Sequence, residues 1–188
     1  MAPHDARTRV FWVLLLTVAL VLFGSRLLPA AGAGPCDAPI ANPIACENSK
    51  AGNPASEWDI PAHDMGDPNI QGYAATISVD QGQTVQFKVK TPANNYRLDI
   101  YRLGYHGGLG ARKIATVQPS ASLPQSQPAC LTNAAVGLVD CGNWAVSASW
   151  SIPADAVSGV YIAKLVREDG TTGVSHIIFI PSSRHAAR

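Results

Sequence analysis

The sequence predicts an all-β protein, an immunoglobulin-like β-sandwich of about seven strands after an N-terminal signal helix. Charged residues make up 14% of the 188 residues, well below the roughly 25% of an average soluble domain. Turn residues recur about every ten positions, and no long helical pattern interrupts them. Apolar and polar residues alternate between the turns with a period of two, which is typical of strands with one buried face.

Seven stretches show this alternation and are the predicted strands. They are residues 73–79, 84–90, 96–101, 111–117, 144–152, 160–167 and 174–180. In the fifth, the apolar residues from Trp144 to Ile152 share one side and three serines take the other. This pattern predicts a sheet with one face in water.

The third and fourth strands are predicted to form a hairpin around a glycine-rich turn. Gly104, Gly107, Gly108 and Gly110 lie between them. A phosphate-binding loop would need glycines that open a helix. Residues 111–117 instead have the pattern of a strand, so these glycines predict a tight turn.

The residues before the sixth strand predict a tyrosine corner. Residues 155–163 resemble the corner that leads into strand F of an immunoglobulin-like sandwich, where a tyrosine hydroxyl bonds back to the preceding backbone. Tyr161 is that tyrosine. Ala163 stands where antibody domains have a cysteine, so no disulfide between the sheets is expected.

The chain is expected to have four parts. Basic residues, an apolar run (10–23) and a small-residue segment predict a signal peptide over residues 1–33. An uncleaved membrane anchor is the alternative, although the run is shorter than the roughly 20 residues of a membrane span. Residues 34–69 form a Pro-rich lead-in in which the prolines should exclude regular helix. The sandwich spans 70–181, and a disordered tail 182–188 follows.

Four cysteines fit an exported protein, either secreted or in the cell envelope. Cys36 and Cys46 lie close together, and Cys130 and Cys141 bracket one loop. In an oxidising compartment such a set forms disulfides. Three pairings are possible, and the two local ones are favoured. A zinc site is the alternative, but neither a C-x2-C pair nor a nearby histidine supports it.

No residue pattern supports catalysis, a metal or a cofactor. A formal net charge of +1 gives no electrostatic reason to expect nucleic acid as a partner. A copper site would need histidines and commonly a methionine near Cys141, and they are lacking. No G-x-S-x-G motif is present, and no pair of carboxylates suits glycoside cleavage.

Several motifs occur in the order found in a known family. They are Asn69-Ile70-Gln71-Gly72-Tyr73, Asp99-Ile100-Tyr101-Arg102-Leu103-Gly104-Tyr105 and Gly107-Gly108-Leu109-Gly110-Ala111-Arg112, with later agreement at residues 57–60, 144–150 and 158–165. Over about residues 42–180 the sequence resembles the N-terminal region of secreted bacterial proteins similar to the N,N-dimethylformamidase large (beta) subunit.

This resemblance implies a β-sandwich that precedes a much larger domain, in which two tyrosines and a glutamate hold iron. None of the tyrosines here can be matched to an iron ligand. We therefore expect a chain truncated before its catalytic domain, with no catalytic residue, metal or cofactor of its own.

The resulting expectation is a non-catalytic accessory or interaction domain. Its expected partner is the missing catalytic domain or a cell-envelope component, and a membrane only if the signal helix is uncleaved. One alternative is an extracellular carbohydrate- or protein-binding module, in which Tyr101, Tyr105 and His106 would contact the ligand or a neighbouring domain. Another is part of an iron-dependent amidase.

Overall fold

The computed structural model describes residues 32–183. The chain divides into two compact units, Met1–Gly34 and Pro35–Arg188, and the elements below belong to the second. The predicted signal peptide, apart from its last two residues, and residues 184–188 of the predicted tail lie outside the described residues. None of the helices within residues 32–183 is long and apolar enough to span a membrane.

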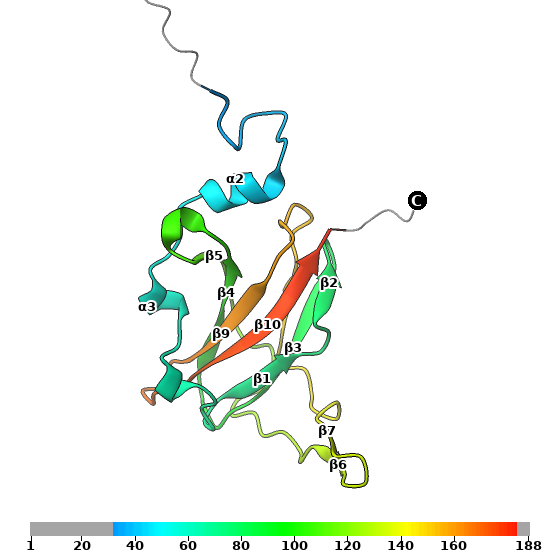
Figure 1. Ribbon diagram of the computed structural model, residues 1–188. Coiled ribbons are helices and arrows are strands. Elements are labelled where there is room, and N and C mark those ends of the chain that lie inside the picture. Colours follow the sequence, from blue (N-terminus) through cyan, green and yellow to red (C-terminus); the bar gives the residue numbers. More distant parts are fainter. Residues whose placement is uncertain (1–31, 184–188) are drawn as a thin grey trace, which may run out of the picture. The chain divides into compact units, whose positions relative to one another are not determined.

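Two sheets pack face to face, which confirms the predicted immunoglobulin-like β-sandwich (Figure 1). The three-stranded sheet has the order β1 (Gln71–Ala74), β3 (Thr84–Lys90) and β8 (Ala148–Ser151). The five-stranded sheet has the order β2 (Ser78–Asp80), β10 (Val174–Ser182), β9 (Tyr161–Arg167), β4 (Tyr96–Leu103) and β5 (Ala111–Val117). Neighbouring strands are antiparallel except β2 and β10, which are parallel.

The core lies between the two sheets and follows the predicted alternation. Its centre is an aromatic cluster in which the Phe179 ring lies 5.5 Å from Phe87, 6.0 Å from Trp150 and 5.7 Å from Tyr161. All four side chains are buried. Aromatic rings at these separations add to the free energy gained by burying their area.

The tyrosine corner is present as predicted. The Tyr161 hydroxyl donates a hydrogen bond to the Val157 carbonyl at 2.8 Å. Burial raises the pKa of Tyr161 to about 12, so the phenol stays protonated and remains a donor. The bond ties the loop before β9 to the strand itself.

We expect Tyr161→Phe to lower the free energy of unfolding by about 1 kcal/mol, the net value of one neutral hydrogen bond. Urea denaturation followed by tryptophan fluorescence would measure the change. Tyr105→Phe is the control because Tyr105 is exposed and should show no change. An equal effect of the two substitutions would mean that the corner bond does not contribute to stability.

The prediction of one continuous first strand is wrong. Residues 73–79 divide between β1 in one sheet and β2 in the other, and the chain crosses between the sheets at residues 75–77. The alternation groups Ile77 with Val79 on one face, but Ile77 lies at this crossing and is exposed, whereas Val79 is buried. An edge strand can change sheets in this way because the two sheets lie only about 10 Å apart.

The expectation that prolines exclude helix from the lead-in is also wrong. The lead-in contains α2 (Pro43–Ser49), α3 (Ala55–Trp58) and the 3-10 turn η1 (Ala62–Asp64). Pro43 occupies the first turn of α2, where a missing N–H costs nothing. The Asn42 side chain caps α2 by accepting the N–H groups of Ile44 and Ala45 at 3.0 and 3.1 Å.

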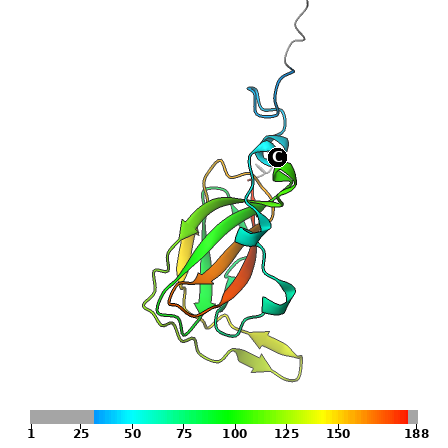
Figure 2. The ribbon, with the colours of Figure 1, turned by 90° about the vertical axis from the view of Figure 1, so that its left-hand side faces the viewer.

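A two-stranded ribbon, not predicted, lies beyond one end of the sandwich, and α2 lies at the other end (Figure 2). The ribbon consists of β6 (Leu131–Asn133) and β7 (Leu138–Asp140). The Cys130–Cys141 disulfide closes its base, and Cys36 pairs with Cys46 beside α2. Both predicted local disulfides are therefore confirmed. The fifth predicted strand is shorter than expected, because regular pairing in β8 begins only at Ala148.

Candidate functional site

Residues 53–60, here called the strap, cross the outer face of the five-stranded sheet. Side chains from three strands bind the consecutive carbonyl groups of residues 57–59. Lys164 Nζ donates to the carbonyls of Glu57 and Asp59 at 2.9 and 3.1 Å. His176 Nε2 donates to the Trp58 carbonyl at 2.7 Å. The Tyr101 hydroxyl donates to the Glu57 carbonyl at 3.3 Å. The strap is thus held through its backbone.

The two basic side chains under the strap, Lys164 and His176, have pKa values below their ordinary values. Burial lowers the pKa of Lys164 below its ordinary value. Burial also lowers the pKa of His176, although its bond to the Trp58 carbonyl opposes that effect. A neutral imidazole with its hydrogen on Nε2 satisfies this contact, so His176 has a structural role here.

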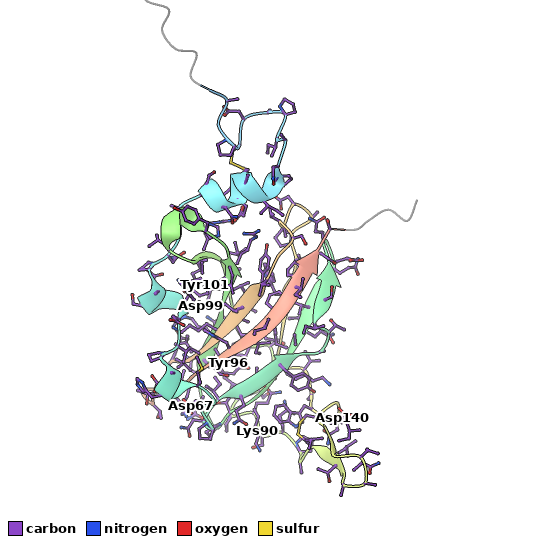
Figure 3. The ribbon with its side chains drawn as sticks, viewed as in Figure 1. Asp67, Lys90, Tyr96, Asp99, Tyr101 and Asp140 are labelled. Carbon is purple, nitrogen blue, oxygen red and sulfur yellow. A yellow bond between two sulfur atoms is a disulfide. The ribbon has the colours of Figure 1, made fainter. Side chains whose placement is uncertain are left out.

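A buried carboxylate, Asp99, lies beside the strap (Figure 3). Its Oδ1 accepts from Lys113 Nζ and Thr116 Oγ1, both at 2.8 Å, and its Oδ2 accepts from Arg97 Nε at 3.0 Å. Burial alone would raise the pKa of Asp99, but these hydrogen bonds outweigh it and hold the pKa below its ordinary value. A carboxylate so fully bonded is not available as a general base.

A second buried carboxylate fixes α2 to the end of the sandwich. Glu47 Oε1 accepts from Arg112 Nε at 2.7 Å, and its Oε2 accepts from Lys50 Nζ at 2.7 Å. Burial would raise the pKa of Glu47, but the bonds from Lys50 and Arg112 lower it below its ordinary value. Arg102 adds a bond to the Asn48 side chain at 3.1 Å.

The three predicted contact residues do not form one exposed surface. Tyr105 is 70% exposed, whereas Tyr101 and His106 are only 2% and 1% exposed. The strap covers Tyr101, and His106 Nδ1 lies 3.2 Å from the Lys50 carbonyl. The prediction of an exposed aromatic group at the hairpin is therefore corrected to Tyr105 alone.

The glycine-rich turn itself is confirmed. Gly107, Gly108 and Gly110 have φ values of 69°, 91° and 85°, which other residues rarely adopt. Gly104 is required for a different reason, since a Cβ atom there would lie 2.3 Å from the Asn48 side-chain oxygen. The turn packs against the lead-in. It contains the short 3-10 turn η2 (His106–Gly108) and leads into β5, so no α-helix follows the glycines to bind a phosphate.

An apolar patch continues the outer face beyond the strap. We define it by five outward-facing residues of β4, β9 and β10 and the residue before β9: Leu103, Val160, Ile162, Ile178 and Ile180. Ile162 is buried in a cluster that includes Trp58 of the strap, and it pairs in register with Ile178. Val160, Ile178 and Ile180 are 41%, 57% and 37% exposed. Residues 177–180 are all apolar, so the sequence alternation does not show which of them face outward, nor that three residues of the patch remain exposed.

The described residues do not fit the iron site that the family resemblance implies. Tyr73, Tyr101 and Tyr161 each donate their hydroxyl to a backbone carbonyl. The buried carboxylates Asp99 and Glu47 bind cationic side chains. Within residues 32–183 no group of three or more His, Cys, Asp or Glu side chains could hold a metal ion.

Residues 97–188 match a protein family described as N,N-dimethylformamidase beta subunit-like, C-terminal. Over these residues the chain is similar to the N,N-dimethylformamidase beta subunit. The resemblance carried by the glycine hairpin is thus confirmed. The family description calls the matched part C-terminal, whereas the motifs suggested an N-terminal region, and truncation before a catalytic domain stays a prediction.

No curated protein matches the chain. A solved structure, an uncharacterized protein from Bacillus anthracis str. Ames, is similar with a TM-score of 0.39 and 15% sequence identity. The match covers 59% of this chain and 80% of that one.

Proposed function

We propose that the chain is a non-catalytic accessory domain that binds a larger protein partner through the apolar patch. The observation that carries this proposal is the group of aliphatic side chains on the outer face of the five-stranded sheet, of which Val160, Ile178 and Ile180 remain exposed. Contiguous apolar groups on a protein surface commonly mark binding sites for other proteins. The strap already covers the adjoining part of the same face, at Tyr101, Lys164 and His176, so a partner would extend an existing layer.

The chemistry of the patch favours a protein over other ligands. Its five side chains are all aliphatic, so they offer no hydrogen bonds to a sugar and no positive charge to a phosphate backbone. The resemblance to the beta subunit suggests the identity of the partner, a larger catalytic domain of the same family. That domain would bury Ile178 and Ile180 as the strap buries Ile162.

Export from the cytoplasm belongs to the same proposal. Two disulfides are typical of proteins that fold in an oxidising compartment, and the predicted signal peptide would direct the chain there. We place the domain in the secreted fraction or the cell envelope.

The test uses the larger domain of a protein from the matched family, expressed separately and mixed with this chain. We expect the two to co-purify, and Ile178→Asp to abolish the association because it places a charge at the centre of the contact. Val136→Asp is a matched control, since Val136 is 72% exposed on the ribbon and far from the patch in sequence. If the unmodified domains do not associate, or Ile178→Asp binds as well as Val136→Asp, the proposal is wrong.

A further inference from the structure

A hollow of about 410 Å³ lies between the ribbon and the outer face of the three-stranded sheet. Tyr73, Ala75 and Lys88 of the sandwich form one side, and Val139 and Asp140 of β7 form the other. It lies on the opposite sheet from the apolar patch, and the proposed protein contact does not involve it. Its volume is within the range of small-ligand sites, roughly 300–1,000 Å³.

The ribbon is held firmly enough to act as a wall of this hollow. The Cys130–Cys141 disulfide closes its base. Three side chains of the sandwich and its connecting loop bind backbone carbonyls at the same place. Tyr73 OH donates to Cys141 at 2.5 Å, Lys88 Nζ to Gly142 at 2.7 Å, and Trp144 Nε1 to Pro128 at 3.0 Å. Anchors on both sides of the ribbon fix its position relative to the sheet.

The sheet face beside the hollow is flat and polar. Gln71, Gln86, Lys90 and Ser149 project from β1, β3 and β8 on that face, and all four are exposed. Within the described part of the chain their side chains form no hydrogen bonds. Figure 3 shows Lys90 and Asp140 at this end of the sandwich. The face therefore offers a row of unused donors and acceptors on both sides of the hollow along β3.

Inside the hollow, apolar and polar groups stand next to one another. Val139, 65% exposed, and Ala75 provide apolar contacts. Asp140 accepts the Gly142 N–H through Oδ1 at 2.7 Å, and its Oδ2 makes no hydrogen bond within residues 32–183. The charges of Asp140 and Lys88 offset each other, so the lining is neutral overall.

We propose that this hollow and the adjoining sheet face bind a neutral polysaccharide. A sugar ring has apolar C–H groups on its faces and hydroxyl groups on its edge. Val139 and Ala75 would contact the C–H groups, while Asp140 Oδ2 and Gln86 would bind hydroxyls. A neutral lining does not favour a polyanion, and a site this polar does not favour a wholly apolar ligand. The accessory domain would then carry two binding faces, one for a protein and one for a glycan.

Affinity gel electrophoresis of the full chain tests this proposal. The gels contain one soluble neutral polysaccharide each: hydroxyethyl cellulose, glycol chitin, xylan or dextran. We expect at least one of them to retard the protein, with little change at 0.5 M NaCl because the polysaccharide is uncharged and the lining of the hollow has no net charge. Asp140→Asn, which keeps an oxygen for the Gly142 N–H, and Gln86→Ala should each weaken binding about three- to tenfold.

The matched control is Tyr105→Ala, which removes an exposed aromatic ring at the opposite hairpin and should leave binding unchanged. The proposal is overturned if none of the four polysaccharides retards the protein. It is also overturned if Asp140→Asn and Gln86→Ala bind as well as the unmodified chain, or if the retardation is lost at 0.5 M NaCl. Circular dichroism of each variant separates loss of binding from loss of folding.

Discussion

Phe179→Ala is expected to lower the free energy of unfolding by about 3–5 kcal/mol, the usual cost of removing a buried phenylalanine ring from a core. Phe179 is fully buried and contacts three other aromatic rings. These rings come from both sheets, so the cavity left by the substitution cannot close without moving one sheet against the other. Urea denaturation with both disulfides intact measures the loss.

The neighbouring residue provides the control. Ile178 lies one position away on β10 but faces outward, so Ile178→Ala should change the free energy of unfolding by no more than about 0.5 kcal/mol. A slip of one residue in the pairing of β10 would exchange the two side chains between core and solvent. A larger loss for Ile178→Ala than for Phe179→Ala would therefore contradict the register with β9.

The inner face of β3 could be predicted from sequence because its cause is local. Phe87 lies in a run with strict alternation, and its burial follows directly from that pattern. Phe179 lies among consecutive apolar residues, 177–180, so the sequence does not show which of them face the core. The corner at Tyr161 was equally predictable, because its hydrogen bond joins residues only four apart. Such local features can be predicted because they do not depend on whether a distant part of the chain covers the residues.

The outer face of the five-stranded sheet could not be predicted in the same way. Asp99 and Tyr101 alternate with core residues and should therefore face water, yet both are buried. Their cover is the strap, which lies more than 40 residues earlier in the sequence and contacts Tyr101 through the Glu57 carbonyl. Periodicity assigns a residue to one face of a sheet, but it does not show whether that face is covered.

The same limit explains why the three predicted contact residues do not form one exposed surface. Tyr101, Tyr105 and His106 are close in sequence, and an aromatic cluster at a hairpin is typical of a binding surface. The lead-in buries two of the three. The hollow beside the ribbon arises instead from Tyr73, Lys88 and Asp140, which are brought together by strand pairing and a disulfide. No short motif marks such a site.

The two faces of the sandwich therefore differ in what they can bind. The five-stranded sheet has a strap held by buried polar groups and an aliphatic patch next to it, which suits a permanent protein contact. The three-stranded sheet has exposed amide, hydroxyl and ammonium groups, which suit a solvated ligand. Substitutions on one face should leave binding at the other unchanged.

Asp99→Asn is expected to lower the free energy of unfolding by about 2–3 kcal/mol at neutral pH. The substitution removes the charge that compensates Arg97 and Lys113 and leaves an amide group facing both. The loss should be smaller than the roughly 3–5 kcal/mol for breaking a fully buried pair. Arg97 and Lys113 are 31% and 34% exposed, so water can partly solvate them. Glu168→Gln is the control, because Glu168 contacts the same Arg97 nearer the surface and should cost at most about 1 kcal/mol.

The pH dependence distinguishes a charge effect from a packing effect. The pKa of Asp99 is lower in the folded chain than in the unfolded chain, where it is about 3.9. Its contribution to stability is therefore fully present above about pH 4 and is lost as the pH falls through the folded value. The difference between the unmodified chain and Asp99→Asn should accordingly shrink in the acid range below about pH 4. A difference that stays constant over this range would mean that Asn disturbs packing around the strap and that the charge of Asp99 does not stabilise the fold.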